Sequence, residues 1–589
     1  MNINNLKSML SLGMRVADRR KPCEGLISFP ETKPPFAPKP LRRYPFPHAL
    51  PEEVGASSGH IAGFLRELAG EKSVGIQSVL IAKDGKLIAD ASFGPYRSDV
   101  WKNTFSECKS VTGLAIGLLY DEGKLTPEEK LTDIFPDRIP TLQKLMIAPM
   151  TVRHLLTMTS QISFNEGESM TSGNWVRSFL TSSLRGPVGG EFHYNSLNSF
   201  LLSAIVREKS GMSLSDYLRE KLFDPMGIEN FYWEKSPEGI EKGGWGLYIL
   251  PEDMLKLGEL MRCRGEWKGR RLLSEKWIGM MTTGYEDAPS TAGYFRYGFQ
   301  MWVGKENGAW LFNGMYGQNM LIYPGTGYVI VSNASNSDMF QQGAYFPLCD
   351  RYFSKPAAKT EEGSAEALAS LIASFKPAIP LPEKHHWLSL FRKEKPAPLI
   401  PQSAMAFAGK SFVPVKKDFA LGLMPRMMQA VQNDFTAGLD KLSFIYEKNA
   451  EGRETFCAVF EEGERRISLP LSFGVPESGN IPIGAAEWLV SAPARAAKNE
   501  DSEPVLIFDA LFLETPFARS FRLTLHEDGA TLRADEKPGK EFITSFASSM
   551  GEDLVRNPVV ESALSRVDRD YIDYKLDTLF RPTVELSEE

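Results

Sequence analysis

The sequence is poor in cysteine and lacks both a surplus of positive charge and a long apolar run. Its five cysteines among 589 residues show no paired Cys-x-x-Cys spacing, which argues against the usual zinc motifs and a disulfide framework. With 67 basic against 74 acidic residues, the chain has no overall basic excess to neutralise nucleic-acid phosphates. We therefore expect a reducing compartment and no nucleic-acid partner.

Segments that enter or cross a membrane are also missing from the sequence. Nowhere do about 18 uncharged apolar residues run together, as a membrane-spanning helix requires. In residues 1–20, apolar side chains are interleaved with Ser, Gly and Asn instead of forming the continuous apolar core of a signal peptide. These absences predict a cytoplasmic protein without a membrane partner. Whether copies of the chain form a homo-oligomer stays open.

The length indicates several domains, because 589 residues exceed what one hydrophobic core usually supports. Prolines recur through residues 21–51, where they block helix and sheet. A charged, Pro-rich stretch after residue 355 indicates a linker. The predicted order is an N-terminal extension (1–50), a catalytic-sized domain (51–355), a linker (356–400), a C-terminal β domain (401–548) and a charged tail (549–589).

Within residues 51–355, predicted strands lie at both ends and predicted helices lie between them. An Asp84-Gly85 pair between two apolar runs marks the first hairpin. This order indicates an α/β (α+β) layered unit whose sheet joins the two ends of the segment. Strand signals after residue 401 favour an antiparallel barrel or sandwich. The main predicted elements are helices 106–123, 152–158, 199–209, 214–221 and 251–262, and strands 297–303, 310–312, 318–323 and 328–332.

Ser106 and Lys109 are the first residues that suggest chemistry. They lie at positions i and i+3 of a predicted helix and therefore share one face. A serine hydroxyl is a weak nucleophile until a base takes its proton, and a lysine can do so where burial lowers its pKa from about 10.4. Taken alone, the same pattern also fits a helix-capping serine beside an exposed lysine.

Two further patterns follow along the chain. Tyr194 precedes Ser196 and Asn198, so its phenol could relay a proton while the other two orient it, although a half-buried structural tyrosine is the simpler interpretation. The segment 313–318, Asn-Gly-Met-Tyr-Gly-Gln, reads as a glycine-rich strand that a substrate backbone could approach, or as a bulge at a sheet edge.

Taken together and in this order, the three patterns resemble the penicillin-recognising serine hydrolases. This superfamily includes class C β-lactamases, low-molecular-weight penicillin-binding proteins, carboxylesterases and 6-aminohexanoate-oligomer hydrolases. The resemblance covers roughly residues 51–355, with further matching segments at 151–160, 225–228 and 272–277. It implies a β-lactamase/transpeptidase-like antiparallel sheet of about five strands flanked by helices. The β domain is similar in position to the lipocalin-like appendages of some relatives.

The resemblance also implies roles for individual residues. Ser106 would be the nucleophile, Lys109 its base, and Tyr194 the donor of a proton to the leaving group. The backbone N–H groups of Ser106 and Met315 would form the oxyanion hole. The substrate-binding positions that it implies are Ser196, Asn198, Asn313, Gly314, Gly317 and Gln318.

Two departures from the family pattern bear on the substrate. Phe312 stands where the family usually has Lys or His, so the cation that grips a β-lactam carboxylate is missing. Ser196 stands where the second motif often has Asn. We therefore expect a serine hydrolase that cleaves small esters or amides. The alternatives are a peptidase or amidase for D-amino-acid peptides or oligomers, a β-lactamase, and a non-catalytic binding module on the same fold.

Other candidate groups have simpler explanations. The Gly-x-Ser-x-Gly pattern at 55–59 has no preceding strand and lies where a helix begins, so we interpret it as a decoy. Cys108 points away from the face of Ser106 and Lys109, which makes a thiol pair with His193 unexpected. His385, His386 and His526 lack further ligands at metal spacing, so neither a metal nor a cofactor is expected.

Overall fold

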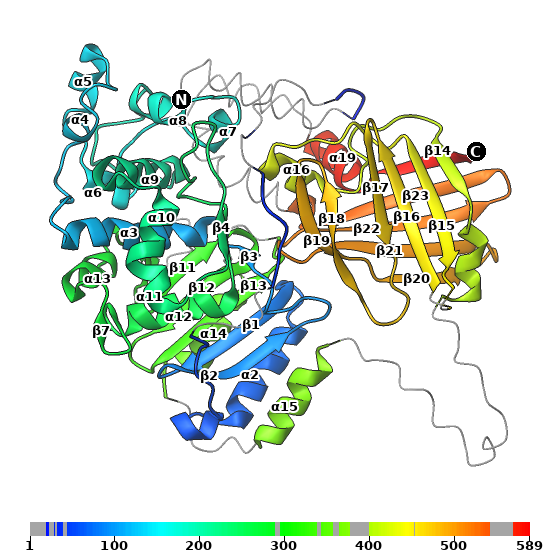
Figure 1. Cartoon of the computed structure of the whole chain (residues 1–589), viewed down its shortest axis with the longest axis horizontal. Helices are drawn as coiled ribbons and strands as arrows, with labels where there is room; N and C mark the ends of the chain where they lie inside the picture. The colour runs from blue at the N-terminus through cyan, green and yellow to red at the C-terminus, as the bar shows by residue number, and fades with distance from the viewer. Residues whose placement is uncertain are drawn as a thin grey trace. The chain divides into compact units, whose positions relative to one another are not determined.

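The computed structural model describes residues 19–22, 29, 32–38, 44–288, 295–337, 343–356, 364–376, 400–450, 452, 454–541 and 569–589. The chain forms two compact units, which we describe separately (Figure 1). The N-terminal unit comprises residues 1–12 and 25–375, and the C-terminal unit comprises residues 13–24 and 376–589. Much of the expected extension, linker and tail lies outside the described residues.

The N-terminal unit is built on an eight-stranded antiparallel sheet. Its strand order is β2 (Lys86–Ser92), β1 (Ile76–Lys83), β13 (Tyr328–Ala334), β12 (Gln318–Tyr323), β11 (Trp310–Gly314), β10 (Trp302–Gly304), β9 (Phe295–Tyr297) and β8 (Glu286–Asp287). Pairing of β1 with β13 joins the two ends of the segment, as predicted. The expected count of about five strands was wrong, because β8, β9 and β10 have only two or three residues each, too few for a sequence pattern to mark them as separate strands.

Helices cover both faces of this sheet (Figure 1). They are α2 (Ser58–Gly70), α3 (Cys108–Asp121), α12 (Pro251–Arg262), α14 (Tyr345–Phe353) and α15 (Ala365–Ser374). Successive residues of β1 face opposite sides, so that Leu80 packs in the cluster of α3 and α12, and Val79 and Ile81 in that of α2 and α14. Because both faces are covered, β1 reads as a continuous apolar run from Val79 to Ala82.

Further helices accompany the sheet. They are α4 (Leu131–Ile134), α5 (Thr141–Ile147), α6 (Val152–Leu156), α7 (Glu166–Ser169), α8 (Trp175–Leu180), α9 (Ser196–Ser210), α10 (Leu214–Leu218), α11 (Asp224–Met226) and α13 (Glu275–Met281). The five main predicted helices are confirmed as α3, α6, α9, α10 and α12. One boundary was wrong, since Ser106 does not open α3 but lies in a preceding 3-10 turn, η2 (Phe105–Glu107). The strand predicted at 297–303 is interrupted between β9 and β10.

A small three-stranded sheet contains the strand that leads into the Ser106 turn. It consists of β3 (Lys102–Asn103), β5 (Leu247–Ile249) and β4 (Phe231–Trp233). The Thr104 N–H continues the β3 pairing by donating to Leu247 O at 2.8 Å. A hairpin of β6 (Glu266–Trp267) and β7 (Arg270–Arg271) completes the unit.

The C-terminal unit contains a nearly closed, barrel-like antiparallel sheet of eleven strands (Figure 1). The order is β17 (Arg465–Pro470), β16 (Glu454–Glu462), β15 (Lys441–Lys448), β14 (Ser411–Pro414), β24 (Thr583–Glu588), β23 (Gly529–Lys537), β22 (Ala518–His526), β21 (Pro504–Phe512), β19 (Ala486–Ser491) and β18 (Ser478–Ile483), with β20 (Ala494–Lys498) paired to β21. Buried Phe508 and Phe521 stack at 5.0 Å between ring centroids. The expected all-β architecture is confirmed, and β24 comes from the segment expected to be a charged tail.

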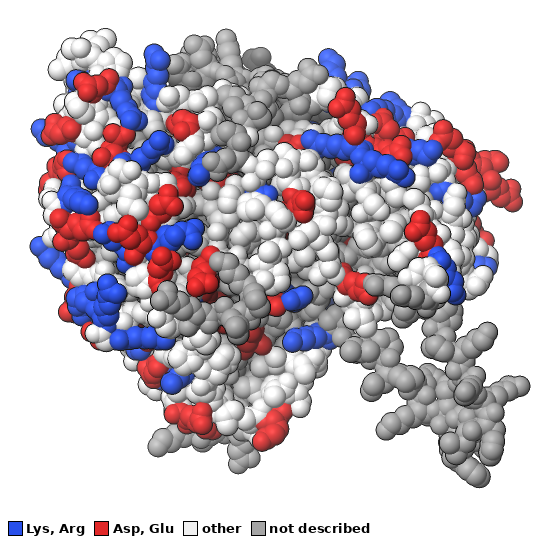
Figure 2. All heavy atoms as spheres, in the orientation of Figure 1, with Lys and Arg blue, Asp and Glu red and all other residues white. Residues whose placement is uncertain are grey.

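Helices and an N-terminal segment also belong to the C-terminal unit. Its described helices include α16 (Arg426–Gln432), α19 (Arg569–Phe580) and the 3-10 helix η7 (Gln402–Phe407). Arg19 Nε donates to Asp418 Oδ2 at 2.8 Å, so part of the expected N-terminal extension packs in this unit. Figure 2 shows Lys and Arg interspersed with Asp and Glu over the face of the N-terminal unit in this view. None of the helices that the structure describes is long and apolar enough to cross a membrane.

Candidate active site

Ser106 lies in the short η2 turn before α3. Between residues 100 and 119, all of which the structure describes, Ser106 is the one residue that is not buried. The preceding residue, Phe105, has a φ of 48°, a left-handed conformation that is costly for a bulky side chain. Backbone strain of this kind persists only where the surrounding structure holds it. The turn therefore presents a single serine hydroxyl from an otherwise buried segment.

The end of β11 packs directly against this turn. A Cβ atom on Gly314 would lie 2.2 Å from the carbonyl oxygen of Thr104, so only glycine fits. Two residues further on, Tyr316 also has a positive φ, of 65°. Its ring meets the Phe105 ring edge to face, with 5.1 Å between the centroids. The two strained aromatic residues brace the Ser106 turn against the strand end.

Two backbone N–H groups at this junction have no partner outside their own helical turns among the described residues. Within the described residues, neither the N–H of Ser106 nor that of Met315 donates to an acceptor outside its own helical turn. Met315 follows Gly314, whose close contact with Thr104 brings the two segments together. Unpaired N–H groups on adjoining segments are what the binding of an oxyanion requires.

Lys109 lies in the first turn of α3, with its Nζ among three oxygen atoms. Nζ is 2.8 Å from Ser106 Oγ, 2.9 Å from Ser196 Oγ and 2.7 Å from Gly244 O. The side chain is 1% exposed. Burial, opposed by the nearby Glu166 carboxylate, lowers the pKa of the ammonium group to about 8. Near that pH a large fraction of Lys109 is a neutral amine that can accept a proton.

The three oxygen partners of Lys109 Nζ indicate which hydroxyl can give its proton to the neutral amine. The Gly244 carbonyl can only accept a hydrogen bond, so it takes one N–H of the amine. The Ser196 hydroxyl accepts a second N–H. The remaining position of the neutral amine is a lone pair, which faces the Ser106 hydroxyl.

Tyr194 provides a proton donor beside this pair. Its ring centroid is 4.9 Å from Lys109 Nζ, and its ring stacks on Trp302 with 5.6 Å between the centroids. Burial raises the pKa of the Tyr194 phenol, and a hydrogen bond with Ser106 acts in the opposite direction. The phenol therefore keeps its proton at neutral pH and can donate it next to Ser106.

Comparison with known proteins identifies a family for part of the chain. Residues 61–344 match the sequence profile of the beta-lactamase family. These residues form a beta-lactamase-family domain. They make up just under half of the chain. The resemblance to the penicillin-recognising superfamily is thereby confirmed, together with the fold that it implied for this unit.

Individual relatives of the beta-lactamase-family domain include hydrolases and penicillin-binding proteins. The 6-aminohexanoate-dimer hydrolase of Paenarthrobacter ureafaciens is 28% identical over 291 residues, which cover 44% of this chain and 72% of the relative. Penicillin-binding protein 4* of Bacillus subtilis is 26% identical over 221 residues, covering 32% of this chain and 47% of the relative. A solved structure of a putative 6-aminohexanoate-dimer hydrolase from Bacillus anthracis, 21% identical, covers 52% of this chain and 86% of its own with a TM-score of 0.44.

In the beta-lactamase-family domain, the second motif is divided between two places. Ser196 reaches the centre, and its backbone N–H donates to Glu166 Oε1 at 2.8 Å. Asn198 does not reach it, because its amide oxygen accepts from Ser160 Oγ at 2.6 Å and its Nδ2 lies 3.4 Å from Met158 Sδ. Asn198 therefore ties α9 to the loop after α6.

The third motif is divided in the same way. Gln318 uses both ends of its amide within the sheet, donating to Ala334 O at 2.8 Å and accepting from Asn333 Nδ2 at 3.0 Å. A Cβ atom on Gly317 would lie 2.6 Å from the Cβ of Ala334, so this glycine permits close packing. Asn313 differs, since its Nδ2 is buried and has no hydrogen-bond partner among the described residues. This unpaired donor distinguishes Asn313 from Asn198 and Gln318, whose amides are paired.

Two groups that contact this centre belong to none of the three motifs. The Gly244 carbonyl accepts from Lys109, and a Cβ atom on Gly244 would lie 2.6 Å from Ser196 O. A Gly243-Gly244 pair is the only signal that the sequence carries. The Glu166 carboxylate has no sequence signature, because it reaches the centre through the backbone of Ser196.

Other candidate nucleophiles have structural roles. Ser57, in the pattern at 55–59, caps α2 by accepting from the His60 N–H at 3.3 Å. Cys108 is fully buried, and burial raises the pKa of its thiol to about 12. No cluster of side chains able to hold a metal ion occurs in the described part of the chain, and His385-His386 lies outside it.

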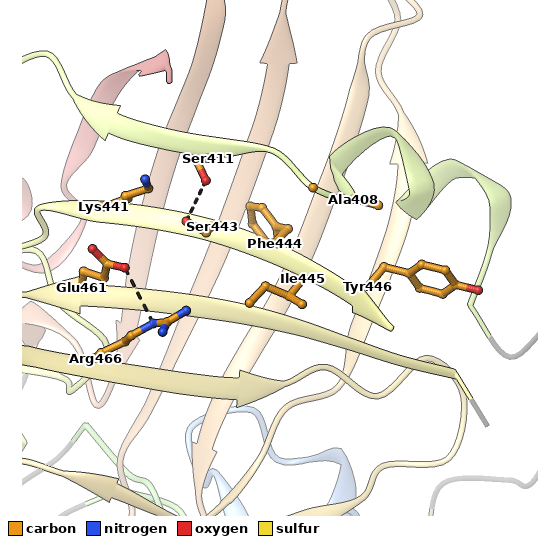
Figure 3. A pocket seen from close by; sticks show the side chains of 10 residues that line it. Ala408, Ser411, Lys441, Ser443, Phe444, Ile445, Tyr446, Glu461 and Arg466 are labelled. Atoms are coloured by element: carbon orange, nitrogen blue, oxygen red, sulfur yellow. Dashed lines mark hydrogen bonds and ion pairs between the residues drawn. The ribbon is translucent and has the colours of Figure 1, made fainter. Parts of the chain in front are cut away.

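A wide hollow of about 560 Å³ lies in the C-terminal unit, over β14 to β17 (Figure 3). Its two serines, Ser411 and Ser443, hydrogen-bond to each other at 2.9 Å. Its cations face carboxylates, with Arg466 3.7 Å from Glu461 and Lys441 paired outside the hollow's lining. The hollow is open and offers no activated nucleophile, so the candidate chemistry stays at Ser106.

Proposed function

We propose that the chain is a serine hydrolase that cleaves small esters or amides through an acyl-enzyme on Ser106. The observation that carries the proposal is the buried Lys109 amine, held 2.8 Å from Ser106 Oγ with a pKa lowered to about 8. The same amine is what a serine needs for activation near neutral pH.

The reaction follows from the hydrogen-bond directions. Neutral Lys109 removes the hydroxyl proton as Ser106 Oγ attacks the carbonyl carbon of the substrate. The N–H groups of Ser106 and Met315 donate to the oxyanion that forms. Tyr194 then donates its proton to the leaving group, and Lys109 returns a proton to the phenol. A water molecule attacks the acyl-enzyme, gives its proton to the same base, and releases the acid and the Ser106 hydroxyl.

The lining of the site bears on the substrate class. Phe312 is fully buried in the hydrophobic core of α3 and α12, so this position supplies no cation for a β-lactam carboxylate. Asn313 offers an unpaired amide donor that suits a neutral acceptor such as an ester or amide carbonyl. The relative named a 6-aminohexanoate-dimer hydrolase favours linear amides as the second substrate class to test.

Labelling and turnover test this proposal together. The wild-type protein is incubated with a fluorophosphonate probe, and the modified residue is located by peptide mass spectrometry. Parallel assays use a p-nitrophenyl ester of a short acid, a linear amide of 6-aminohexanoic acid and a chromogenic cephalosporin. We expect the label on Ser106, and turnover of the ester or the amide at least about tenfold faster than that of the cephalosporin. An unlabelled Ser106 with no turnover would favour the binding module.

Tyr194→Phe is expected to separate substrates by their leaving groups. An amine must be protonated to leave, whereas p-nitrophenolate leaves as an anion, so loss of the phenol should affect the amide more. We expect kcat to fall by about 10²-fold for an amide and by less than about tenfold for the p-nitrophenyl ester of the same acid. Equal losses on both substrates would contradict the role of Tyr194 as proton donor.

A further inference from the structure

A buried ion pair is linked by hydrogen bonds to the Ser106 turn and takes no part in the proposed chemistry. Glu234 and Lys242 are 6% and 2% exposed, and Lys242 Nζ is 2.7 Å from Glu234 Oε2. Two charges removed from water are stabilised only when further hydrogen bonds accompany their attraction. The partners of this pair therefore indicate what it holds in place.

One set of partners belongs to the loop that binds Lys109. The Glu234 N–H donates to Gly246 O at 2.9 Å, and the Lys242 N–H donates to Glu234 O at 2.9 Å. Together with the ion pair, these bonds close the loop 242–246 at both ends. Inside it, Gly244 O accepts from Lys109 Nζ at 2.7 Å. The ion pair thus fixes the carbonyl that orients the catalytic amine.

The other set of partners leads to the Ser106 turn. Glu234 Oε1 accepts from Tyr248 Oη at 3.2 Å, and Tyr248 Oη accepts from Asn103 Nδ2 at 3.1 Å. Asn103 Oδ1 in turn accepts from the N–H of Phe105 at 3.0 Å. Phe105 is the strained residue that precedes Ser106. One carboxylate therefore supports both the base and the nucleophile.

Described residues of the N-terminal extension cover this network. Phe29 lies over the Lys242 ammonium, with 4.2 Å from Nζ to the ring centroid. Lys33 Nζ lies 5.8 Å from the Tyr248 ring centroid, and Lys33 is 4% exposed. Phe36, also 4% exposed, packs on Trp101. Residues 33 and 36 share a face because an extended, proline-rich segment repeats every three residues.

We propose that the Glu234–Lys242 pair, covered by Phe29, Lys33 and Phe36, is the positioning element that holds Lys109 and Ser106 in register. Glu234 and Lys242 are positioning residues, since they act through Gly244 O and the Phe105 N–H. The extension, which precedes residues 61–344, thereby becomes a working part of the hydrolase. This inference rests on the proposed function of Ser106 and Lys109.

Loss of the network should change the pKa of Lys109 in a definite direction. The groups that face the Lys109 ammonium are Ser106, Ser196, Gly244 O and the Tyr194 ring, and the Glu166 carboxylate acts on it through charge. The neighbouring Cys108 thiol stays neutral, because burial raises its pKa to about 12. A loosened loop weakens the Gly244 contact, which disfavours the charged amine, and admits water, which favours it. Burial is the largest cause of the lowered pKa of Lys109, so the effect of water dominates. The pH at which Lys109 becomes an effective base should therefore rise, while substrate affinity changes little.

The test uses the double variant Glu234→Gln/Lys242→Met, which removes both charges without leaving one unpaired. The matched control is Asp253→Asn/Lys256→Met, because Lys256 Nζ is 2.7 Å from Asp253 Oδ1 in an equally buried pair, where it also donates to Gly227 O at 3.0 Å. Fluorophosphonate labelling of Ser106 and turnover of the p-nitrophenyl ester are measured from pH 6 to 10. For the Glu234/Lys242 variant we expect about tenfold slower labelling at pH 7 than for the wild type and an unchanged KM. The rising limb of its pH–rate profile should move to higher pH by at least about half a unit. The control should keep the wild-type limb.

The outcomes separate this inference from the proposed function. A wild-type protein that is not labelled at Ser106 argues against the proposed function itself. A labelled wild type with a folded Glu234/Lys242 variant of unchanged rate and unchanged pH limb overturns the positioning role. If that variant does not fold, Phe29→Ala is tested in its place, since it leaves the Glu234–Lys242 ion pair intact. It should shift the limb in the same direction by a smaller amount, and an unshifted limb would overturn the inference.

Discussion

Ser106→Ala is expected to lower kcat/KM for the p-nitrophenyl ester by at least about 10⁴-fold, because no acyl-enzyme can form without the Ser106 hydroxyl. Two hydroxyls lie within 3 Å of Lys109 Nζ, those of Ser106 at 2.8 Å and Ser196 at 2.9 Å. Ser196 is 6% exposed, whereas Ser106 is the open position of its segment. We therefore expect that Ser196 cannot take over as the nucleophile when the Ser106 hydroxyl is removed. Steady-state kinetics and probe labelling of the purified variant measure the effect.

Ser110→Ala is the matched control for this experiment. Ser110 lies one turn further along α3, is 2% exposed, and donates to Gln300 O at 2.5 Å. Its loss should cost about 1 kcal/mol of stability and less than about threefold in turnover. If Ser106→Ala retained a tenth of the wild-type rate with a label on Ser196, the nucleophile would have been misassigned.

The spacing of Ser106 and Lys109 could be predicted from the sequence because both lie on one helical segment, where periodicity determines neighbours. The 3-10 turn that displaces Ser106 from α3 could not. The positive φ of Phe105 is held by its contact with Tyr316 and by the fit of Gly314 against Thr104. These partners come from about 200 residues further along the chain, and no local pattern records them.

The binding residues show the same limit. Asn198 and Gln318 were implied by motif position, yet their amides bond within α9 and its neighbouring loop and within the sheet. Gly244 and Glu166 contact the centre through a carbonyl oxygen and a backbone N–H. Backbone groups are common to all residue types, so the sequence offers little to identify them. The motifs mark Ser106, Lys109 and Tyr194, but no motif marks the Gly244 carbonyl or the Glu166 carboxylate.

Lys109→Met should separate the base from the rest of the site. Met preserves most of the side-chain volume and removes the proton acceptor, so we expect kcat/KM to fall by about 10³- to 10⁴-fold at pH 8. The pH profile should also change form. Because burial lowers the pKa of Lys109 to about 8, the wild-type rate should fall about tenfold per pH unit below that value, where the amine is charged. Without the amine, this titration should disappear from the profile.

Stability and a matched variant complete the interpretation of Lys109→Met. The wild-type site keeps a buried amine whose charged form is disfavoured, so its removal should leave the thermal midpoint within about 5 °C of the wild type. The Asp253/Lys256 variant, which also replaces a buried lysine by Met, should retain both the rate and the titration near pH 8. A folded Lys109→Met variant that still showed that titration would assign it to another group. Disappearance of the titration together with the rate would tie the limb to Lys109, because every other charged group of the centre is intact in that variant.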